Sequence, residues 1–301
     1  MNSTLEQETK ATWRDYLEMC KPRVVLLMLI TAYVGMHLAT PGLVSLWIVC
    51  FGLLGIALMA GSAAVINHLV DSKVDAIMAR TKLRPIPTGK IDPMNALVFA
   101  IVVGLVGFVV LMVLVNTLTA VLTFATLIGY AIIYTMFLKR TTPQNIVLGG
   151  LAGAMPPMLG WTAVTGTFEP NSLLLVAIIF IWTPPHFWAL AIYRYNEYKK
   201  VADIPMLPIT HGIPFTKTLI LLYTVLLLAV SWLPFVVGMS GLTYFIGATV
   251  LGLIFLYYAV KLKINDDPKI GRATFRYSII YLFILFVFLF VDHYVFFKFG
   301  I

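Results

Sequence analysis

Three residues with oxygen-bearing side chains, Asn67, Asp71 and Asp75, follow one another at intervals of four at the end of a long apolar run. A helical step of four turns by about 40°, so we expect all three on one helical stripe. Two carboxylates so close repel each other, and each costs about 3 kcal/mol near hydrocarbon unless it finds water or a partner. Oxygen ligands without histidine or thiol favour a hard cation such as magnesium, which also binds phosphate oxygens of a substrate.

A basic loop follows this stripe directly and contains Arg80, Lys82 and Arg84. Arginine binds phosphate through a planar fork and lysine as a point charge, so the loop offers donors to a phosphate group. The simpler alternative is a solvated helix end whose acids pair with Lys73 and Arg80. The combination of an amide, two carboxylates and a basic loop favours the ligand-binding interpretation.

Two further polar patches follow later apolar runs. In "YTMFLKRTTPQN", ordinary membrane anchoring explains the cations as well as phosphate binding does. In "YRYNEYKKVADIPMLPITHG", acids again lie beside cations, although a juxtamembrane loop would look similar. The candidates for phosphate binding are Lys139, Arg140, Lys199 and Lys200, the weaker candidates for a metal are Glu197 and Asp203, and the candidate pocket tyrosines are Tyr134, Tyr193 and Tyr198.

His186, in "FIWTPPHFWALAIY", lies inside an apolar run, where ionisable residues are rare and often functional. Pro184 and Pro185 directly before it remove two backbone donors and are expected to kink the helix. A neutral imidazole there could approach a haem iron or bond a substrate. A buried histidine satisfied by a neighbouring helix is the alternative.

The elements that must position these groups are membrane-spanning helices. The chain of 301 residues is 60% hydrophobic and 11% charged, with a mean hydropathy of +0.95, far from an ordinary soluble domain. Nine apolar runs are long enough to cross about 30 Å of hydrocarbon. They cover approximately residues 24–40, 44–66, 93–115, 118–138, 143–161, 172–193, 215–237, 241–262 and 274–297.

The distribution of positive charge predicts the orientation of these spans. Of the 21 Lys and Arg residues, all except Lys298 fall in the amino-terminal segment or in the loops after even-numbered spans. Cytoplasmic loops collect cations, so the amino terminus and the acidic clusters are predicted to face the cytoplasm and the carboxyl terminus the other side. The net charge of +8 is then a topology signal, and no nucleic-acid partner is expected. We expect a cytoplasmic segment, 1–22, and one transmembrane domain, 23–301.

The stretch "NHLVDSKVDAIMARTKLRPIPTGKI" resembles the Asn-x-x-x-Asp-x-x-x-Asp motif and basic loop of the UbiA-type intramembrane prenyltransferases. "WTPPHFWALAIYR" and "YKKVADIPMLPITHG" are similar to the branch of that family that acts on haem. The resemblance implies an all-α membrane protein with nine helices around a central cavity, in the bacterial inner membrane. It implies transfer of farnesyl from farnesyl diphosphate to a vinyl group of haem B, with addition of water, giving haem O.

The resemblance also implies roles for individual residues. Asn67, Asp71 and Asp75 would hold Mg²⁺ and diphosphate, Arg80 and Arg84 would bind phosphate, and His186 would contact haem. Glu197 is not followed by an acid four residues later, unlike the second motif of quinone-type members, which favours haem over a quinone precursor as acceptor. Haem A synthase or a terminal oxidase is a possible partner for the product.

An alternative function from a different class of membrane protein is that of a secondary transporter, whose acids would couple transport to protons or sodium. It predicts acids near the middle of the membrane, whereas both acidic clusters here lie at the ends of spans.

Overall fold

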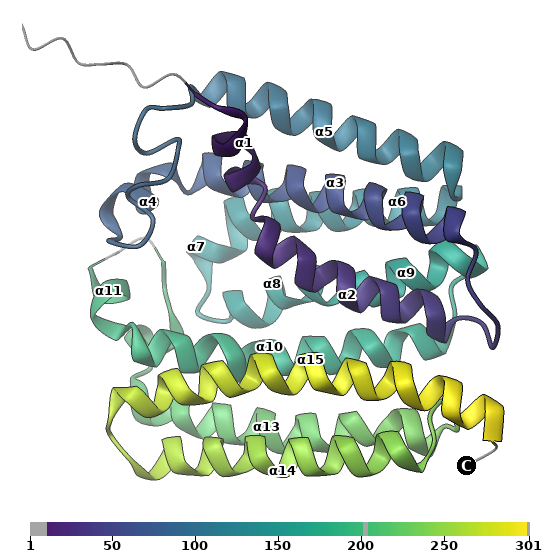
Figure 1. Ribbon diagram of the computed structural model, residues 1–301. Coiled ribbons are helices and arrows are strands. Elements are labelled where there is room, and N and C mark those ends of the chain that lie inside the picture. Colours follow the sequence, from purple (N-terminus) through teal and green to yellow (C-terminus); the bar gives the residue numbers. More distant parts are fainter. Residues whose placement is uncertain (1–10, 201–203, 300–301) are drawn as a thin grey trace, which may run out of the picture.

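The computed structural model describes residues 11–200 and 204–299, and every regular element among them is a helix. Several long helices lie side by side and roughly antiparallel in Figure 1, joined by short connections at both ends and by short helices at one end. The elements are α1 (Trp13–Met19), α2 (Pro22–Leu38), α3 (Leu46–Val70), α4 (Ser72–Ile77), α5 (Pro93–Leu114), α6 (Thr117–Ile128), the π-helix η1 (Gly129–Leu138), α7 (Lys139–Thr141), α8 (Asn145–Ala154), α9 (Pro156–Thr165), α10 (Pro170–Tyr193), α11 (Tyr195–Lys199), α12 (Leu207–Thr210), α13 (Ile213–Val236), α14 (Leu242–Ile264) and α15 (Pro268–Phe299).

The predicted number of spans agrees with the structure. Among the described residues, eight helical segments are long and apolar enough to cross a membrane, and there are nine if α1 and α2 together count as one span bent by 54°. Each of the nine predicted runs overlaps one of these segments. Their outward faces are rich in exposed Leu, Val, Ile and Phe side chains, as hydrocarbon requires. The chain is therefore an all-α, multi-pass membrane protein.

Besides the bent first span, two further spans are not single α-helices. The fourth changes from α6 into the π-helix η1, where the Thr135 hydroxyl donates to the carbonyl of Tyr130, five residues earlier. The fifth breaks at Met155, because Pro156 cannot donate a backbone hydrogen bond. Both irregularities lie in helices that adjoin the apolar pocket described below, and π-turns are frequent at functional sites.

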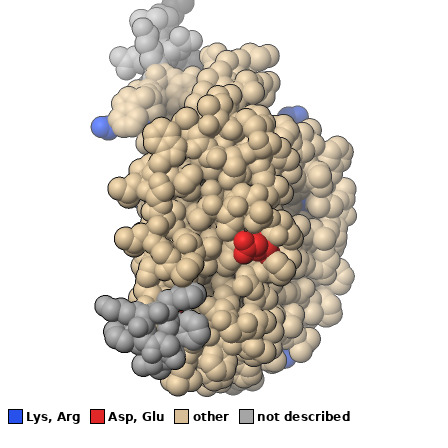
Figure 2. All heavy atoms as spheres, turned by 90° about the vertical axis from the view of Figure 1, so that its right-hand side faces the viewer, with Lys and Arg blue, Asp and Glu red and all other residues tan. Residues whose placement is uncertain are grey.

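The bundle has two unlike ends. The short helices α1, α4, α7 and α11 lie at one end, which we call the charged end, on the left of Figure 1. At the opposite end, the described connections 39–45, 115–116, 166–169 and 237–241 contain one charged residue, Glu169. Figure 2 shows that face as almost entirely uncharged, with one acidic patch and a few cations near its rim. The charge asymmetry predicted from the sequence is thus present in the fold.

Helices α2 and α9 touch through their backbones at two glycines. A Cβ atom on Gly35 would lie 2.0 Å from the Pro157 carbonyl oxygen, and one on Gly160 would lie 2.0 Å from the Ala32 carbonyl oxygen. Any side chain larger than hydrogen would force the helices apart, as in other close crossings of membrane helices. The α2–α9 contact is therefore a fixed seam in the bundle.

A buried carboxylate stabilises the end of the bundle opposite the charged end. Asp292 of α15 is fully buried and accepts hydrogen bonds from the backbone N–H groups of Gly241 (2.6 Å) and Tyr244 (2.9 Å). These groups belong to the start of α14, where a helix has unpaired donors and positive partial charge. Asp292 therefore acts as a cap supplied by a neighbouring helix.

Candidate functional site

The predicted stripe of oxygen ligands forms at the charged end of α3. Helix α3 ends at Val70 and Asp71 caps it, yet the backbone N–H of Asp75 still bonds the Asp71 carbonyl at 2.8 Å, so the spacing of four remains helical. The Asn67 Nδ2 group donates to Asp71 Oδ2 at 2.8 Å. All three side chains are at least nine-tenths buried. The structure therefore brings Asn67 and Asp71 into direct contact, as the spacing predicted.

The cations that pair with these acids are not the ones expected of a solvated helix end. Asp75 Oδ2 bonds Arg84 at 2.5 Å, and Asp71 Oδ2 bonds Lys139 Nζ at 2.5 Å. Neither Lys73 nor Arg80 forms an ion pair among the described residues, and both are exposed. The alternative in which these acids pair with Lys73 and Arg80 is therefore wrong.

The patch around Lys139 meets the stripe from another part of the chain. Helix α7 directs Lys139 to Asp71, while Arg140 donates to the Val70 carbonyl at 3.0 Å. Asn145, at the start of α8, holds this turn by donating to the Lys139 carbonyl at 3.2 Å. Lys139 and Arg140 thus do more than anchor a loop, because both contact the end of α3.

Lys21 is a site residue that sequence reasoning treated only as a topology charge. Its Nζ atom donates to Asn67 Oδ1 at 2.5 Å. Its backbone is left-handed (φ 51°), which is uncommon for a residue other than glycine, and it joins α1 to α2 at their bend. Desolvation and the charges of Arg84 and Lys139 lower the pKa of Lys21 to about 7. Its position immediately before Pro22 and the first apolar run was the available signal.

The donor set fits a hard divalent cation. Asp71 Oδ1 is buried and has no hydrogen-bond partner among the described residues, although the other oxygen of the same carboxylate accepts two bonds. A buried carboxylate oxygen without a hydrogen-bond partner is costly and is typical of an atom that binds a metal or a substrate group. The described residues hold no cluster of three His, Cys, Asp or Glu side chains, so any metal there must share its ligands with Asn67, water or substrate oxygens.

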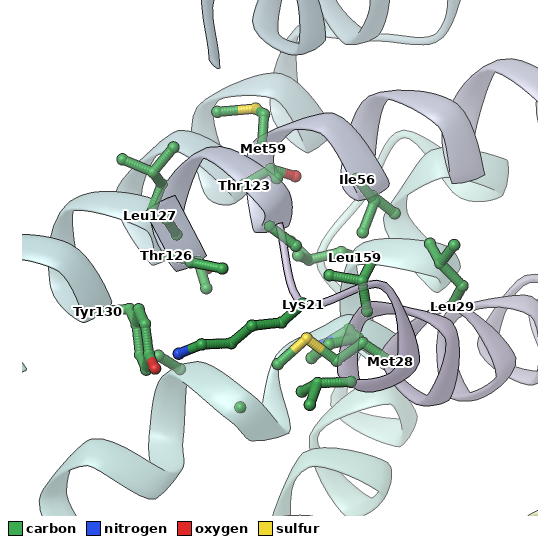
Figure 3. A pocket seen from close by; sticks show the side chains of 18 residues that line it. Lys21, Met28, Leu29, Ile56, Met59, Thr123, Thr126, Leu127, Tyr130 and Leu159 are labelled. Atoms are coloured by element: carbon green, nitrogen blue, oxygen red, sulfur yellow. The ribbon is translucent and has the colours of Figure 1, made fainter. Parts of the chain in front are cut away.

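An apolar pocket begins at Lys21 (Figure 3). Figure 3 shows the Lys21 side chain extending among the lining residues, with its ammonium pointing toward Tyr130. From Lys21 the wall follows α2 to Leu29, about 12 Å at 1.5 Å per residue. The other lining residues are Val24, Val25, Met28, Ile56, Met59, Ala60, Ala63, Ala64, Thr123, Thr126, Leu127, Tyr130, Ala152, Gly153, Pro156 and Leu159. Lys21 is therefore common to the polar site and to the pocket.

Two tyrosines of the π-helix lie near this site. The rings of Tyr130 and Tyr134 are 5.5 Å apart, and Tyr130 lines the same pocket as Lys21. The predicted candidate Tyr134 thus lies near the site but does not line the apolar pocket, whereas Tyr130, which the sequence did not single out, does.

The second acidic patch adjoins the first but shares no ion pair with it among the described residues. Glu197 bonds Arg194 at 3.1 Å within the turn that begins α11. Burial raises the pKa of Tyr198, and the positive charges of Arg80 and Arg194 oppose that rise. Lys82, Lys199 and Lys200 are exposed and Tyr193 is half-buried, while Asp203 lies outside the described residues.

His186 is buried in α10 and held by α15. Its Nδ1 lies 2.7 Å from the Ser278 hydroxyl, and its ring lies between Trp182 and Phe275. The side chain thus has a partner on a neighbouring helix, as expected for a structural histidine, while Nε2 makes no hydrogen bond to a described residue.

Known proteins resemble this chain over most of its length. It is 66% identical over 282 residues to a protoheme IX farnesyltransferase of Legionella pneumophila strain Paris, covering 94% of this chain and 96% of that protein. Its fold matches a solved digeranylgeranylglyceryl phosphate synthase with a TM-score of 0.78 at 18% identity, covering 93% and 98% of the two chains. It also matches a UbiA homologue from Archaeoglobus fulgidus bound to GPP and Mg²⁺, with a TM-score of 0.62 at 17% identity, covering 92% and 99%.

The model of the UbiA prenyltransferase family matches residues 28–291. This range includes the buried acids, the basic loop, the π-helix and His186, so the match extends over the whole site except Lys21, Val24 and Val25. On this ground, and on the close relative above, the chain belongs to the UbiA prenyltransferase family.

Proposed function

We propose that this protein transfers the farnesyl group of farnesyl diphosphate to a vinyl group of haem B, with addition of water, and releases haem O and diphosphate. The observation that carries the proposal is the 66% identity, over 94% of the chain, to a relative named for this reaction. The buried carboxylates beside an apolar pocket supply the arrangement that such a reaction needs.

Asp71, Asp75 and Asn67 would hold Mg²⁺, and a bound Mg²⁺ neutralises charge on the departing diphosphate. The unpaired Oδ1 atom of Asp71 supports this assignment, as does the Mg²⁺ in the fold relative from Archaeoglobus. Magnesium usually takes few protein ligands and completes its shell with water and phosphate oxygens, so two carboxylates and an amide suffice.

Lys139, Arg84 and Lys21 would bind the diphosphate. Each of these cations bonds one of the three metal-binding candidates at 2.5 Å, so each already points at the same small volume. When a diphosphate enters, its oxygens offer these donors a stronger charge-assisted bond than a single carboxylate oxygen does. Preorganised positive charge stabilises the leaving group as the C–O bond breaks.

The farnesyl chain would extend from Lys21 into the apolar pocket. The pocket begins where the diphosphate would be held, and its walls are mainly Ala, Leu, Ile, Met and Val side chains. Such walls exclude water from a developing allylic cation. The ring of Tyr130 at the mouth offers a negative face to that cation.

The terminal vinyl carbon of haem B would attack the first carbon of the farnesyl group. The new C–C bond leaves a cation on the vinyl carbon next to the porphyrin ring, and water adds there and releases a proton. His186 would contact the haem and hold it in place for this attack, so no nucleophilic side chain of the protein is needed.

The charged end would face the cytoplasm, where farnesyl diphosphate is soluble, and the bilayer would be the bacterial inner membrane. The single charge in the described connections of the opposite end supports this orientation. The product would leave within the membrane toward a haem A synthase or a terminal oxidase.

The test uses purified protein in detergent with haem B, farnesyl diphosphate and Mg²⁺, and detects haem O by its mass. Omission of Mg²⁺ tests the metal, and a quinone precursor offered in place of haem tests the acceptor. Farnesylation of the quinone precursor without any haem O would overturn the proposal.

A further inference from the structure

The imidazole of His186 is held in one orientation by three aromatic rings. Trp182 stacks on the imidazole, with ring centroids 4.2 Å apart and an interplanar angle of 21°. The Phe275 ring centroid lies 4.6 Å from that of the imidazole, at an interplanar angle of 31°. Phe187 meets it edge-on at 4.8 Å. Because these neighbours restrict the ring, its two nitrogens have fixed directions.

The bonds of Ser278 decide which nitrogen carries the proton. Ser278 Oγ is 2.7 Å from the Phe275 carbonyl oxygen and 2.7 Å from His186 Nδ1. A hydroxyl has one proton, and a carbonyl oxygen can only accept, so the proton must lie between Oγ and the Phe275 oxygen. Without it, two sets of lone pairs would face each other at 2.7 Å. Ser278 Oγ therefore accepts from His186, and Nδ1 carries the hydrogen.

The other nitrogen is then a free electron-pair donor. A neutral imidazole has one N–H group, so a hydrogen on Nδ1 leaves Nε2 with its lone pair. No described residue bonds Nε2. Trp182 also donates from Nε1 to the Ser278 carbonyl at 2.8 Å, which ties the ring that stacks on His186 to the same residue of α15.

We infer that Ser278 is a positioning residue that fixes the tautomer of His186 and presents Nε2 to the iron of the haem substrate. The inference rests on the proposed function, because it takes haem as the acceptor. Histidines that bind metals usually donate their second N–H group to an oxygen, which orients the ring and increases its basicity, and loss of that oxygen typically weakens binding 10- to 100-fold.

Two of the other buried histidines, His68 and His37, lack this arrangement. Both ring nitrogens of His68 are buried without a partner, and His37 has a buried unpaired Nε2 while its Nδ1 lies 2.5 Å from the Tyr294 hydroxyl. A tyrosine hydroxyl can donate or accept, so the contact does not define a tautomer. His293 has an oxygen acceptor too, the Thr40 carbonyl 3.0 Å from its Nε2, but that contact lies at the end of the bundle opposite the acidic stripe.

The test measures haem binding by Ser278 variants of the full chain in detergent. We expect Ser278→Ala to bind haem B 10 to 100 times more weakly by absorbance titration, with little change in the KM for farnesyl diphosphate. Ser278→Thr keeps the acceptor and should bind like the unmodified protein. Ser172→Ala is the matched control: it removes a fully buried hydroxyl that bonds a carbonyl three residues earlier, at the far end of α10.

A vibrational measurement distinguishes a change in the bond between His186 and the haem iron from a general disturbance of the fold. Resonance Raman spectra of the ferrous haem complex should show an iron–histidine stretch that disappears in His186→Ala and shifts to lower frequency in Ser278→Ala. If Ser278→Ala does not fold, Ser278→Cys, a near-isosteric and weaker acceptor, should shift the band in the same direction.

The outcomes distinguish this inference from the proposed function. An unchanged haem affinity and stretching frequency in Ser278→Ala would overturn the role of Ser278, even if the protein makes haem O. Absence of an iron–histidine band in an active, unmodified protein would overturn ligation by His186 and leave farnesyl transfer to haem intact. Absence of haem O, measured separately, would count against the proposed function.

Discussion

The two acidic clusters at the charged end differ in the origin of their cations. Asp71, on the stripe, bonds Lys139, which lies 68 residues later, and its side chain is 5% exposed. Glu197, in the second cluster, bonds Arg194 three residues earlier and is 37% exposed. One cluster is assembled from distant segments in a water-poor setting, while the other is a local pair at a helix end.

This difference shows why the residue types alone could not tell which of the two clusters matters more for the reaction. A local, half-exposed pair contributes little, because water and salt screen it and the side chains lose freedom. Buried charges cost several kcal/mol each and persist only with good partners or a function. We therefore expect the reaction to depend on the stripe much more than on the second cluster.

The largest effect should come from neutral variants of the acids. Asp71→Asn or Asp75→Asn should lower kcat/KM by about 100-fold or more, because each loses charge that holds the metal at the leaving group. Glu197→Gln is the matched variant and should change the rate by less than about threefold, as for a screened pair. A comparable loss in Glu197→Gln would show that both clusters hold the metal.

A stability measurement tests the pairing itself. Lys139→Met should lower the free energy of unfolding by about 2 kcal/mol, because it leaves the Asp71 carboxylate buried with only a neutral donor. The double variant Lys139→Met with Asp71→Asn removes both charges and should recover most of this loss without recovering activity. Thermal unfolding in detergent measures both, and equal losses in the single and double variants would contradict a buried pair.

Lys21→Met should raise the KM for farnesyl diphosphate about tenfold, since it removes one charge-assisted bond to phosphate. The expected effect on kcat is smaller, because the other cations remain. Lys199→Met, in the exposed second cluster, is the control and should leave KM unchanged. Steady-state assays at saturating haem decide this, and equal effects of the two lysines would remove the distinction between the clusters.

The smallest effect should be the coupling between Arg194 and Glu197. A double-mutant cycle in which both residues are changed to alanine should give a coupling free energy of at most about 0.5 kcal/mol, and this energy should fall with added salt. A coupling that is larger and insensitive to salt would show that this pair is buried in the functional protein.

The parts of this molecule that depend on local spacing could be predicted from the sequence. The nine spans follow from runs of apolar residues, and the contact between Asn67 and Asp71 follows from four residues making slightly more than one helical turn. Burial of His186 follows from its place within an apolar run. None of these requires knowledge of which helices are neighbours.

The partners could not be predicted, because packing between helices determines them. Lys21 and Lys139 looked like ordinary anchoring charges, and only the fold shows that both reach the end of α3. The change of α6 into a π-helix, which places Tyr130 at the pocket mouth, has no simple sequence signature. The proton on His186 depends on Ser278, 92 residues away.

The backbone seam between α2 and α9 also restricts how a lipid-soluble substrate can travel. Val25 and Leu159, from these two helices, line the pocket, so the seam forms part of its wall. Two backbones in contact leave no gap for a hydrocarbon chain. A farnesyl group therefore cannot enter the pocket between α2 and α9 and must pass another part of its wall.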